Sequence, residues 1–267
     1  MRGYISYFKT VLLTNLQYKI AALAGLCTQF FWGFLQIFIY EAFYEGVGDN
    51  APIVYGDLVD YVWLQQAFFA LIYIRHRDDE LANSIKNGQI AYELVRPYNL
   101  YFWWYIKCIA KKYASVALRF FPIIFTALLL PEPYNLSSPD SLVAFLLFLL
   151  ALVLGSLVLT GIIVILQNIM FFTLEDKGIN SVINTIAELL AGLILPIPLL
   201  PDVLKAIASA LPFRLIGDLS FRIYSGNIPI KEATINILFQ LLWICILVIV
   251  GYLLTKKSTK KLQIQGG

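Results

Sequence analysis

The sequence RHRDDELANSIKNGQIAYELVRPY, residues 75–98, is the one long charged segment between two strongly apolar halves of the chain. It carries the usual signals of a short helix, which Asp78 is predicted to cap and Asn87-Gly88 to end. Arg96-Pro97 then predicts an extended residue before another helix begins. We interpret the segment as a rigid docking surface. Its short helix is expected to hold Asp79 and Glu80 in the first turn, Leu81 and Ile85 on one face, and Lys86 near the end.

The composition is that of an integral membrane protein. Of the 267 residues, 60% are hydrophobic and only 14% are charged, whereas soluble domains carry about 25% charged residues. Mean hydropathy is +0.75. A net charge of +3 gives no indication of nucleic-acid binding. Cys27, Cys108 and Cys245 lie far apart in apolar or aromatic surroundings, and with one histidine in the chain no familiar metal-ligand spacing is present, so we interpret them as packing residues.

Six apolar stretches are each long enough to cross a hydrocarbon core, which needs about 20 residues of helix. The fold class is therefore predicted to be all-α, with one transmembrane domain over residues 1–267. Asp57 and Asp60 at one end of the second stretch, and Arg119 within the third, must reach the interface or face protein. The predicted spans are Ile20–Tyr40, Tyr55–Ile74, Tyr113–Leu130, Leu142–Leu166, Ile179–Leu200 and Ile235–Leu254.

Residues 1–19 contain Arg2, Lys9 and Lys19 and no small-residue cleavage site, so they do not resemble a removable signal peptide. Apolar residues recur at helical spacing along this stretch and would form one face of an amphipathic helix in the membrane interface. These residues are Ile5, Phe8, Leu12 and Leu16.

The distribution of Lys and Arg predicts the orientation, because these residues gather on cytoplasmic loops. With both termini in the cytoplasm, that side holds 16 of the 20, and the outer side keeps only four, all in one long connection. Both termini are therefore predicted to be cytoplasmic. The domain then divides into an interfacial helix (1–19), spans one and two (20–74), a cytoplasmic loop with a second interfacial helix (75–112), spans three to five (113–200), an outer re-entrant segment (201–232), span six (233–254) and a cytoplasmic tail (255–267).

The second interfacial helix is predicted from six aromatic residues within positions 98–105, followed by Lys107, Lys111 and Lys112. Aromatic rings and basic side chains are both stable at the level of the lipid headgroups. The helix is either only an aromatic belt or a lever that passes movement from the docking segment to the third span.

The outer connection starts where the prolines after the fifth span cannot continue a helix. Residues 202–232 are too long for a simple connector and too short and polar to span twice, so a pair of re-entrant helices is expected, covered by protein. The residues that mark this outer segment are Pro196, Pro198, Pro201, Pro212, Phe213, Arg214 and Gly226.

The sequence lacks the common motifs for catalysis. There is no Gly-x-x-x-x-Gly-Lys-Ser/Thr phosphate loop, no Gly-x-Ser-x-Gly elbow, and only one histidine, His76, so nothing indicates an enzyme.

Glu188 is the acid placed deepest in an apolar stretch, which requires it to face protein or water. Three interpretations of Glu188 are open. It lies on a substrate path, it makes a structural bond to a neighbouring helix, or it lies nearer the surface than its place in the predicted span suggests. Gln29, Gln36 and Gln65 are weaker candidates for the same path, since amides also bond neighbouring helices together.

The chain resembles the permease subunits of type-2 ABC exporters. Residues 84–97, with Ile85, Gly88 and Ile90 followed by Leu94, Arg96 and Pro97, look like the "I-x-x-G-x-I followed by L-x-R-P" signature of one branch of that family. The prolines at 196, 198 and 201, Leu-Pro-Phe-Arg at 211–214 and Tyr-x-Gly at 224–226 look like its outer-segment signature. The six-span order and the amphipathic N-terminal helix agree with this resemblance.

This resemblance implies a subunit that pairs with a second permease, identical or related, and with two copies of a separate ABC ATPase, in a bacterial-type plasma membrane and among its lipids. ATP and Mg would be bound by the ATPase, and no cofactor by this chain. The docking segment would be the coupling helix that contacts the ATPase. Its expected contact and hinge residues are Asp78, Asp79, Glu80, Leu81, Ile85, Asn87, Gly88, Gln89, Leu94, Arg96 and Pro97.

Two alternatives come from other classes of protein. An ATP-independent secondary transporter usually has internal repeats, and none is evident between residues 1–130 and 131–267. A membrane-embedded enzyme would need His, Asp or Cys clustered at the interface, and only Asp78-Asp79-Glu80 approaches this.

Overall fold

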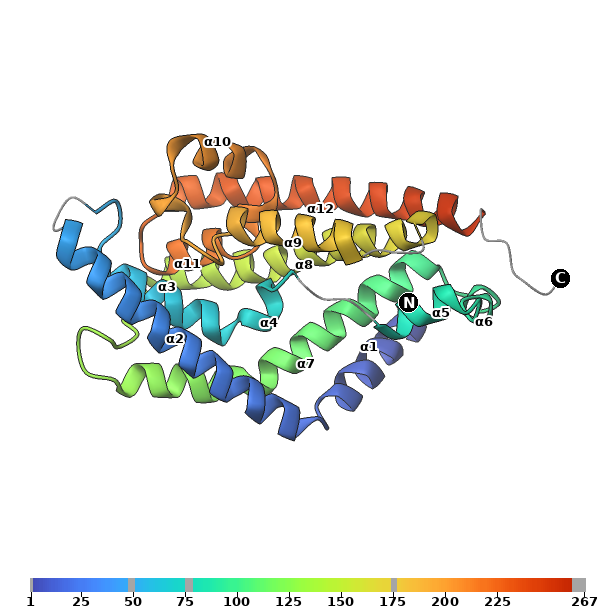
Figure 1. The fold of residues 1–267 in the computed structure, drawn as a ribbon, viewed down its shortest axis with the longest axis horizontal. Helices are drawn as coiled ribbons and strands as arrows, with labels where there is room; N and C mark the ends of the chain where they lie inside the picture. Colours follow the sequence, from blue (N-terminus) through green and yellow to red (C-terminus); the bar gives the residue numbers. More distant parts are fainter. Residues whose placement is uncertain (1, 48–50, 75–78, 174–176, 261–267) are drawn as a thin grey trace.

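The computed structural model describes residues 2–47, 51–74, 79–173 and 177–260, and all regular elements in these ranges are helical. Figure 1 shows the longer helices packed side by side, with the short helices of the outer connection gathered toward one end. In chain order the elements are α1 (Arg2–Asn15), α2 (Lys19–Val47), α3 (Tyr55–Ala67), α4 (Phe69–Ile72), α5 (Asp79–Lys86), α6 (Ala91–Leu94), α7 (Leu100–Leu129), α8 (Leu142–Thr173), α9 (Lys177–Leu190), η2 (Ile197–Leu199), α10 (Asp202–Ala210), η3 (Phe213–Leu215), α11 (Asp218–Tyr224) and α12 (Ile230–Thr259).

Four of the helices, within the described residues, are long and apolar enough to cross a membrane: Lys19–Gly46 in α2, Leu100–Leu129 in α7, Leu142–Ile169 in α8 and Ile230–Thr259 in α12. They contain most of the predicted first, third, fourth and sixth spans. The six-span count depends on two further segments and stays a prediction.

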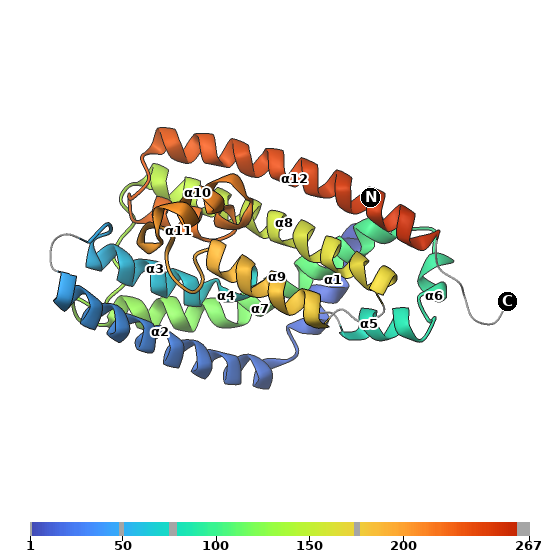
Figure 2. The same ribbon diagram turned by 45° about the horizontal axis from the view of Figure 1, so that its top comes forward.

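The predicted second span is the pair α3 and α4, which meet at Phe68. It is unlike the other spans because the ten residues from Leu58 to Ala67 are all buried inside the protein. A helix that is enclosed by protein needs no apolar surface for lipid, so it tolerates Asp60, Gln65 and Gln66. Helices α2, α7 and α11 pack against α3 and supply this enclosure (Figure 2).

The predicted fifth span, residues 179–200, is shorter than expected. Helix α9 ends at Leu190, and Gly192 follows with a φ of +77°. The break therefore comes before Pro196, because a left-handed glycine ends the helix earlier than the prolines would.

The boundary predicted between an interfacial helix at 98–112 and a third span at Tyr113 is wrong. Both belong to α7, which runs without interruption from Leu100 to Leu129. Pro122 lies inside this helix, and Figure 1 shows α7 bent along its length. Proline removes one backbone hydrogen bond and commonly kinks a helix in this way. The aromatic residues at 101–105 are thus the first turns of α7, and their place at the headgroup level stays a prediction.

Helix α8 lies at the centre of the bundle, where α12 packs along it and α11 packs across it. Two glycines of α8 allow these close contacts. A Cβ at Gly161 would lie 2.9 Å from the Cβ of Leu247 in α12, and a Cβ at Gly155 would collide with the carbonyl oxygen of Ile216 beside α11. The outer segment is therefore packed directly onto the central helix.

Candidate functional site

The short helix α5 is held against the membrane helices by its apolar side. Leu81 is only 3% exposed and belongs with Ile90 to a buried cluster that contains Tyr101, Trp104 and Val164 of α7 and α8. This position differs from the predicted role of Leu81 as an ATPase contact, because a side chain buried inside the chain presents no surface to a partner. Leu81 instead fixes the docking segment to α7 and α8.

The predicted end of α5 at Asn87-Gly88 is confirmed. Gly88 has a φ of +71°, and the N–H of Ile90 donates to the carbonyl oxygen of Ser84 across the turn at 3.0 Å. A residue with a side chain rarely adopts this backbone conformation, so glycine suits the position. Gln89 and Asn87 are exposed beside it. The turn directs the chain from α5 into α6.

Two acids of the segment bind α7. Glu80 Oε2 lies 2.8 Å from Nζ of Lys107, although the Glu80 side chain is 78% exposed. Glu93 Oε2 accepts a hydrogen bond from Nε1 of Trp104 at 2.9 Å. Asp78 and the side chains of Asp79 and Ile85 lie outside the described part of the chain, so their predicted contacts stay predictions.

The apolar surface that the segment presents lies in and directly after α6. Tyr92 is 77% exposed, Val95 is 84% exposed, and Leu94 is partly exposed between them. Leu94 was predicted from its motif position, whereas Tyr92 and Val95 were not. The sequence carries no signal that separates Tyr92 and Val95 from the other apolar residues of the segment, because the contact of Glu93 with Trp104 is visible only in the structure.

The junction between the docking segment and α7 is clamped by α1. The ring of Tyr7 stacks on Trp103 with centroids 3.5 Å apart, and Tyr98 stacks on the same ring at 5.1 Å. The hydroxyl of Tyr4 accepts a hydrogen bond from the N–H of Asn99 at 3.0 Å. Arg96 lies over Trp103 with its Cζ 5.8 Å from the ring centroid, so the Arg96-Pro97 turn is part of this clamp. No residue of α1 is buried, which agrees with a helix on the outside of the bundle.

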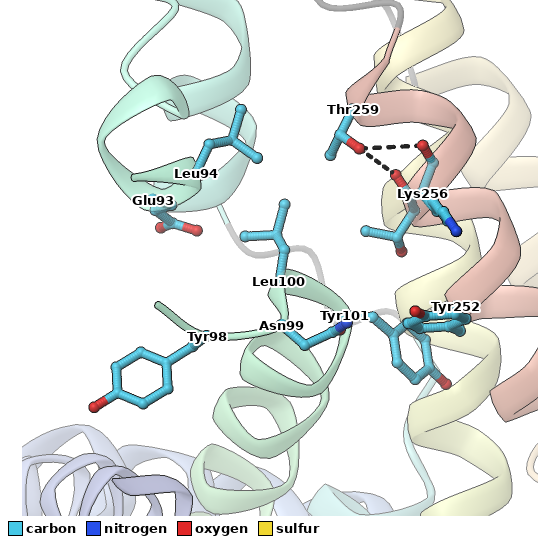
Figure 3. Close-up of a pocket in the computed structure, with 10 residues that line it drawn as sticks. Glu93, Leu94, Tyr98, Asn99, Leu100, Tyr101, Tyr252, Lys256 and Thr259 are labelled. Carbon is cyan, nitrogen blue, oxygen red and sulfur yellow. Dashed lines mark hydrogen bonds between the residues drawn. The ribbon is translucent and has the colours of Figure 1, made fainter. Parts of the chain in front are cut away.

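An open cleft separates the docking segment from the end of α12. Its volume is about 260 Å³. Figure 3 shows Leu94 and Leu100 on one side of it, and Thr259 and Lys256 of α12 on the other. The Thr259 hydroxyl donates to backbone oxygens of its own helix, those of Thr255 and Lys256. The cleft therefore lies between the docking segment and the last turns of α12.

At the other end of the molecule, the outer segment is held by buried polar groups of α3. The Tyr61 hydroxyl donates to the Gly192 carbonyl at 3.0 Å and lies 3.3 Å from Oδ1 of Asp218. The same Asp218 oxygen accepts from the N–H of Ile197 at 3.2 Å. Arg222 approaches Oδ2 at 3.5 Å. Burial raises the pKa of the Asp218 carboxyl, and the neighbouring Arg222 opposes this rise.

The predicted pair of outer helices corresponds to α10 and α11. Pro196, Pro201 and Pro212 each directly precede a helical turn, and Pro198 lies inside η2. Phe213 begins η3, and Arg214 donates to Oδ1 of Asn236 in α12 at 2.6 Å. Gly226 has a φ of +77° and faces Asp140. Six of the seven residues in α11 are buried, so it is covered by protein as expected for such a helix.

A family model described as an ABC-2 family transporter protein matches residues 30–266. The chain belongs to the ABC-2 transporter family. No curated protein matches it significantly. Family membership makes this chain a membrane-spanning permease component of a transporter, and not an enzyme by itself.

Four residues were predicted to line a translocation path in this ABC-2 permease. Among the described residues, no contact brings these four together. Gln65 donates to the carbonyl oxygen of Leu193 at 2.7 Å, next to the break after α9. Gln36 accepts from Gln66 at 3.2 Å, and Gln29 is buried. The two bonded amides thus join neighbouring segments, which was the alternative interpretation.

Glu188 lies in the last turn of α9, close to the break at Gly192, and is partly exposed. It was predicted near the middle of a span, and the early end of α9 moves it to the end of a helix. Its role on a translocation path in this ABC-2 permease stays a prediction. Among the described residues, no group of three or more His, Cys, Asp or Glu is placed to hold a metal ion.

Proposed function

We propose that the chain is the permease of an ABC exporter in a bacterial-type plasma membrane, driven by two copies of a separate ATPase and paired with a second permease, identical or related. ATP and Mg are bound by the ATPase. Both termini and the docking segment lie in the cytoplasm. Family membership supports a transport role, and the concentration of Lys and Arg on one side supports the orientation.

The observation that carries the proposal is the contrast within residues 79–97. Leu81 and Ile90 are buried against α7 and α8, while Tyr92 and Val95 point away from the chain. Large exposed apolar side chains on a fixed frame are typical of a surface that binds another protein. A force applied to α6 passes through this buried cluster to α7 and α8.

The open cleft between α6 and α12 supports the same mechanism. Closure of the ATPase pair on ATP would push α6, which borders this cleft, and the movement would shift the balance between two arrangements of the helices. The Tyr7–Trp103 stack ties α1 to the same junction, so the N-terminal helix would move with it.

The test is co-purification with the ABC ATPase of the same transporter. The double variant Tyr92→Asp, Val95→Asp should fold normally, because both side chains are exposed, and should lose the ATPase. Val203→Asp in α10 is the matched control, since Val203 is also 72% exposed but lies in the outer segment. Full ATPase recovery with the double variant would refute this docking surface.

A further inference from the structure

A second cavity lies between α4 and α7 and has a volume of about 220 Å³. Stacked aromatic rings of Phe69 and Tyr73 form one wall, with centroids 4.7 Å apart. Lys111, Ser115 and Arg119 form the other wall, because a spacing of four residues places them on one face of α7. Among the residues that the structure describes, no acidic side chain lines this cavity.

Lys112 also lines the cavity, but its ammonium group is bonded to backbone oxygens of the opposite wall. It is 3% exposed, and its Nζ donates to the carbonyl oxygens of Tyr73 at 2.9 Å and Ala70 at 3.2 Å. These oxygens lie at the end of α4, where a cation is stabilised by the unpaired carbonyls. Lys112 therefore holds the two walls together.

Arg119 is the group that lacks a partner. It makes no hydrogen bond or ion pair with any described residue, and its buried Nε has no acceptor. Its guanidinium lies against Gly25 of α2, where a Cβ would be only 2.5 Å from the Arg119 Cζ. The glycine thus makes room for the guanidinium. A half-buried cation with no acceptor is costly unless an anion compensates it.

We propose that this cavity binds a phosphate-type oxyanion, supplied by the head group of an anionic lipid in the leaflet on the docking-segment side. Lys111 lies near the polar boundary of α7, and Arg119 lies about 12 Å further along the helix axis. A basic pocket between membrane helices at this depth suits a lipid phosphate. Arginine binds such an oxyanion through paired N–H groups. The inference does not depend on the proposed transport function.

The experiment uses the full chain in nanodiscs of phosphatidylcholine with or without phosphatidylglycerol, followed by native mass spectrometry of retained lipid. The unmodified chain should retain phosphatidylglycerol, and Arg119→Gln should reduce its occupancy about tenfold through loss of a charge-assisted bond. Lys205→Gln, which changes an exposed cation in α10, should leave retention unchanged. Gly25→Ala keeps the charge but displaces the guanidinium, so it should also reduce retention, and it tests the site if Arg119→Gln does not fold.

A second arm titrates inorganic phosphate into the chain in phosphatidylcholine nanodiscs and follows thermal unfolding. Stabilisation by phosphate that Arg119→Gln abolishes, without selective retention of phosphatidylglycerol, would support the oxyanion site and overturn its assignment to a lipid. Equal behaviour of the unmodified chain, Arg119→Gln and Gly25→Ala in both arms would overturn the proposal.

Discussion

The hydroxyl of Tyr61 in α3 donates a 3.0 Å hydrogen bond to the carbonyl oxygen of Gly192, which lies 131 residues further along the chain. Gly192 adopts a φ of +77°, and a Cβ at this position would collide with that hydroxyl. The end of α9 and the buried face of α3 therefore determine each other, and the outer segment begins where they meet.

Replacement of Gly192 by alanine should destabilise the protein by about 2 kcal/mol or more, since it adds backbone strain and displaces the Tyr61 hydroxyl from its acceptor. Unfolding in mixed micelles would measure this. Gly56→Ala is the control, because a Cβ there meets nothing within 4 Å. It should change the stability by less than about 1 kcal/mol. Equal effects of the two substitutions would contradict the role assigned to Gly192.

The buried carboxyl of Asp218 predicts that the stability of the protein depends on pH. Because burial raises its pKa, the folded state keeps the proton to higher pH than the unfolded state does, and stability falls as pH rises from about 3.9 toward the raised value. Arg222→Met removes the cation that opposes this rise, so it should raise the pKa further and make the fall larger. Unfolding measured between pH 4 and pH 7 should show a steeper loss in Arg222→Met. Adding Asp218→Asn should remove the extra dependence, and its persistence would exclude Asp218 as the source.

Burial of Leu81 predicts a local effect on the docking segment. Leu81→Ala leaves a cavity among Ile90, Tyr101 and Trp104, with a cost of about 2–5 kcal/mol. Hydrogen exchange at residues 79–94 should become faster. Leu142→Ala removes a leucine that is 75% exposed and should leave this exchange unchanged. Normal protection of residues 79–94 in Leu81→Ala would mean that the cluster does not hold α5.

The stack of Tyr7 on Trp103 predicts how α1 is held. Tyr7→Ala should cost about 0.5–1.5 kcal/mol of aromatic contact and should speed hydrogen exchange in α1 without unfolding the bundle. Ser6→Ala is the control because Ser6 is exposed on the same helix and lies outside its predicted apolar face. If the two variants exchange alike, the clamp at Trp103 is not what holds α1.

Local chemistry explains which parts of the fold were predictable. Asn87-Gly88 ends α5 because glycine alone readily adopts its φ of +71°, and this information is contained in two adjacent residues. The long apolar runs of α8 and α12 predicted two membrane-spanning helices just as directly. Prolines 196, 201 and 212 marked the broken outer segment because closely spaced prolines disfavour a regular helix, whereas the single Pro122 is accommodated within α7.

The remaining features depend on partners that are remote in sequence. Leu81 faces inward because Tyr101 and Trp104 lie beneath α5, and helical spacing does not say which partner covers an apolar face. Glu188 lies in the last turn of α9 because the helix ends before Gly192, whose carbonyl oxygen accepts a hydrogen bond from the remote Tyr61. No proline or glycine lies between Leu100 and Phe121, so the sequence does indicate that α7 is continuous. The aromatic residues at its start instead suggested a separate interfacial helix.

The most direct test of the docking surface is site-specific photocrosslinking in the assembled transporter. A photoreactive amino acid replaces Tyr92 in one variant and Val203 in the other, both being exposed positions. Illumination should crosslink position 92 to the ABC ATPase and leave position 203 without that product. An ATPase crosslink from position 203, or none from position 92 in an intact complex, would contradict the account.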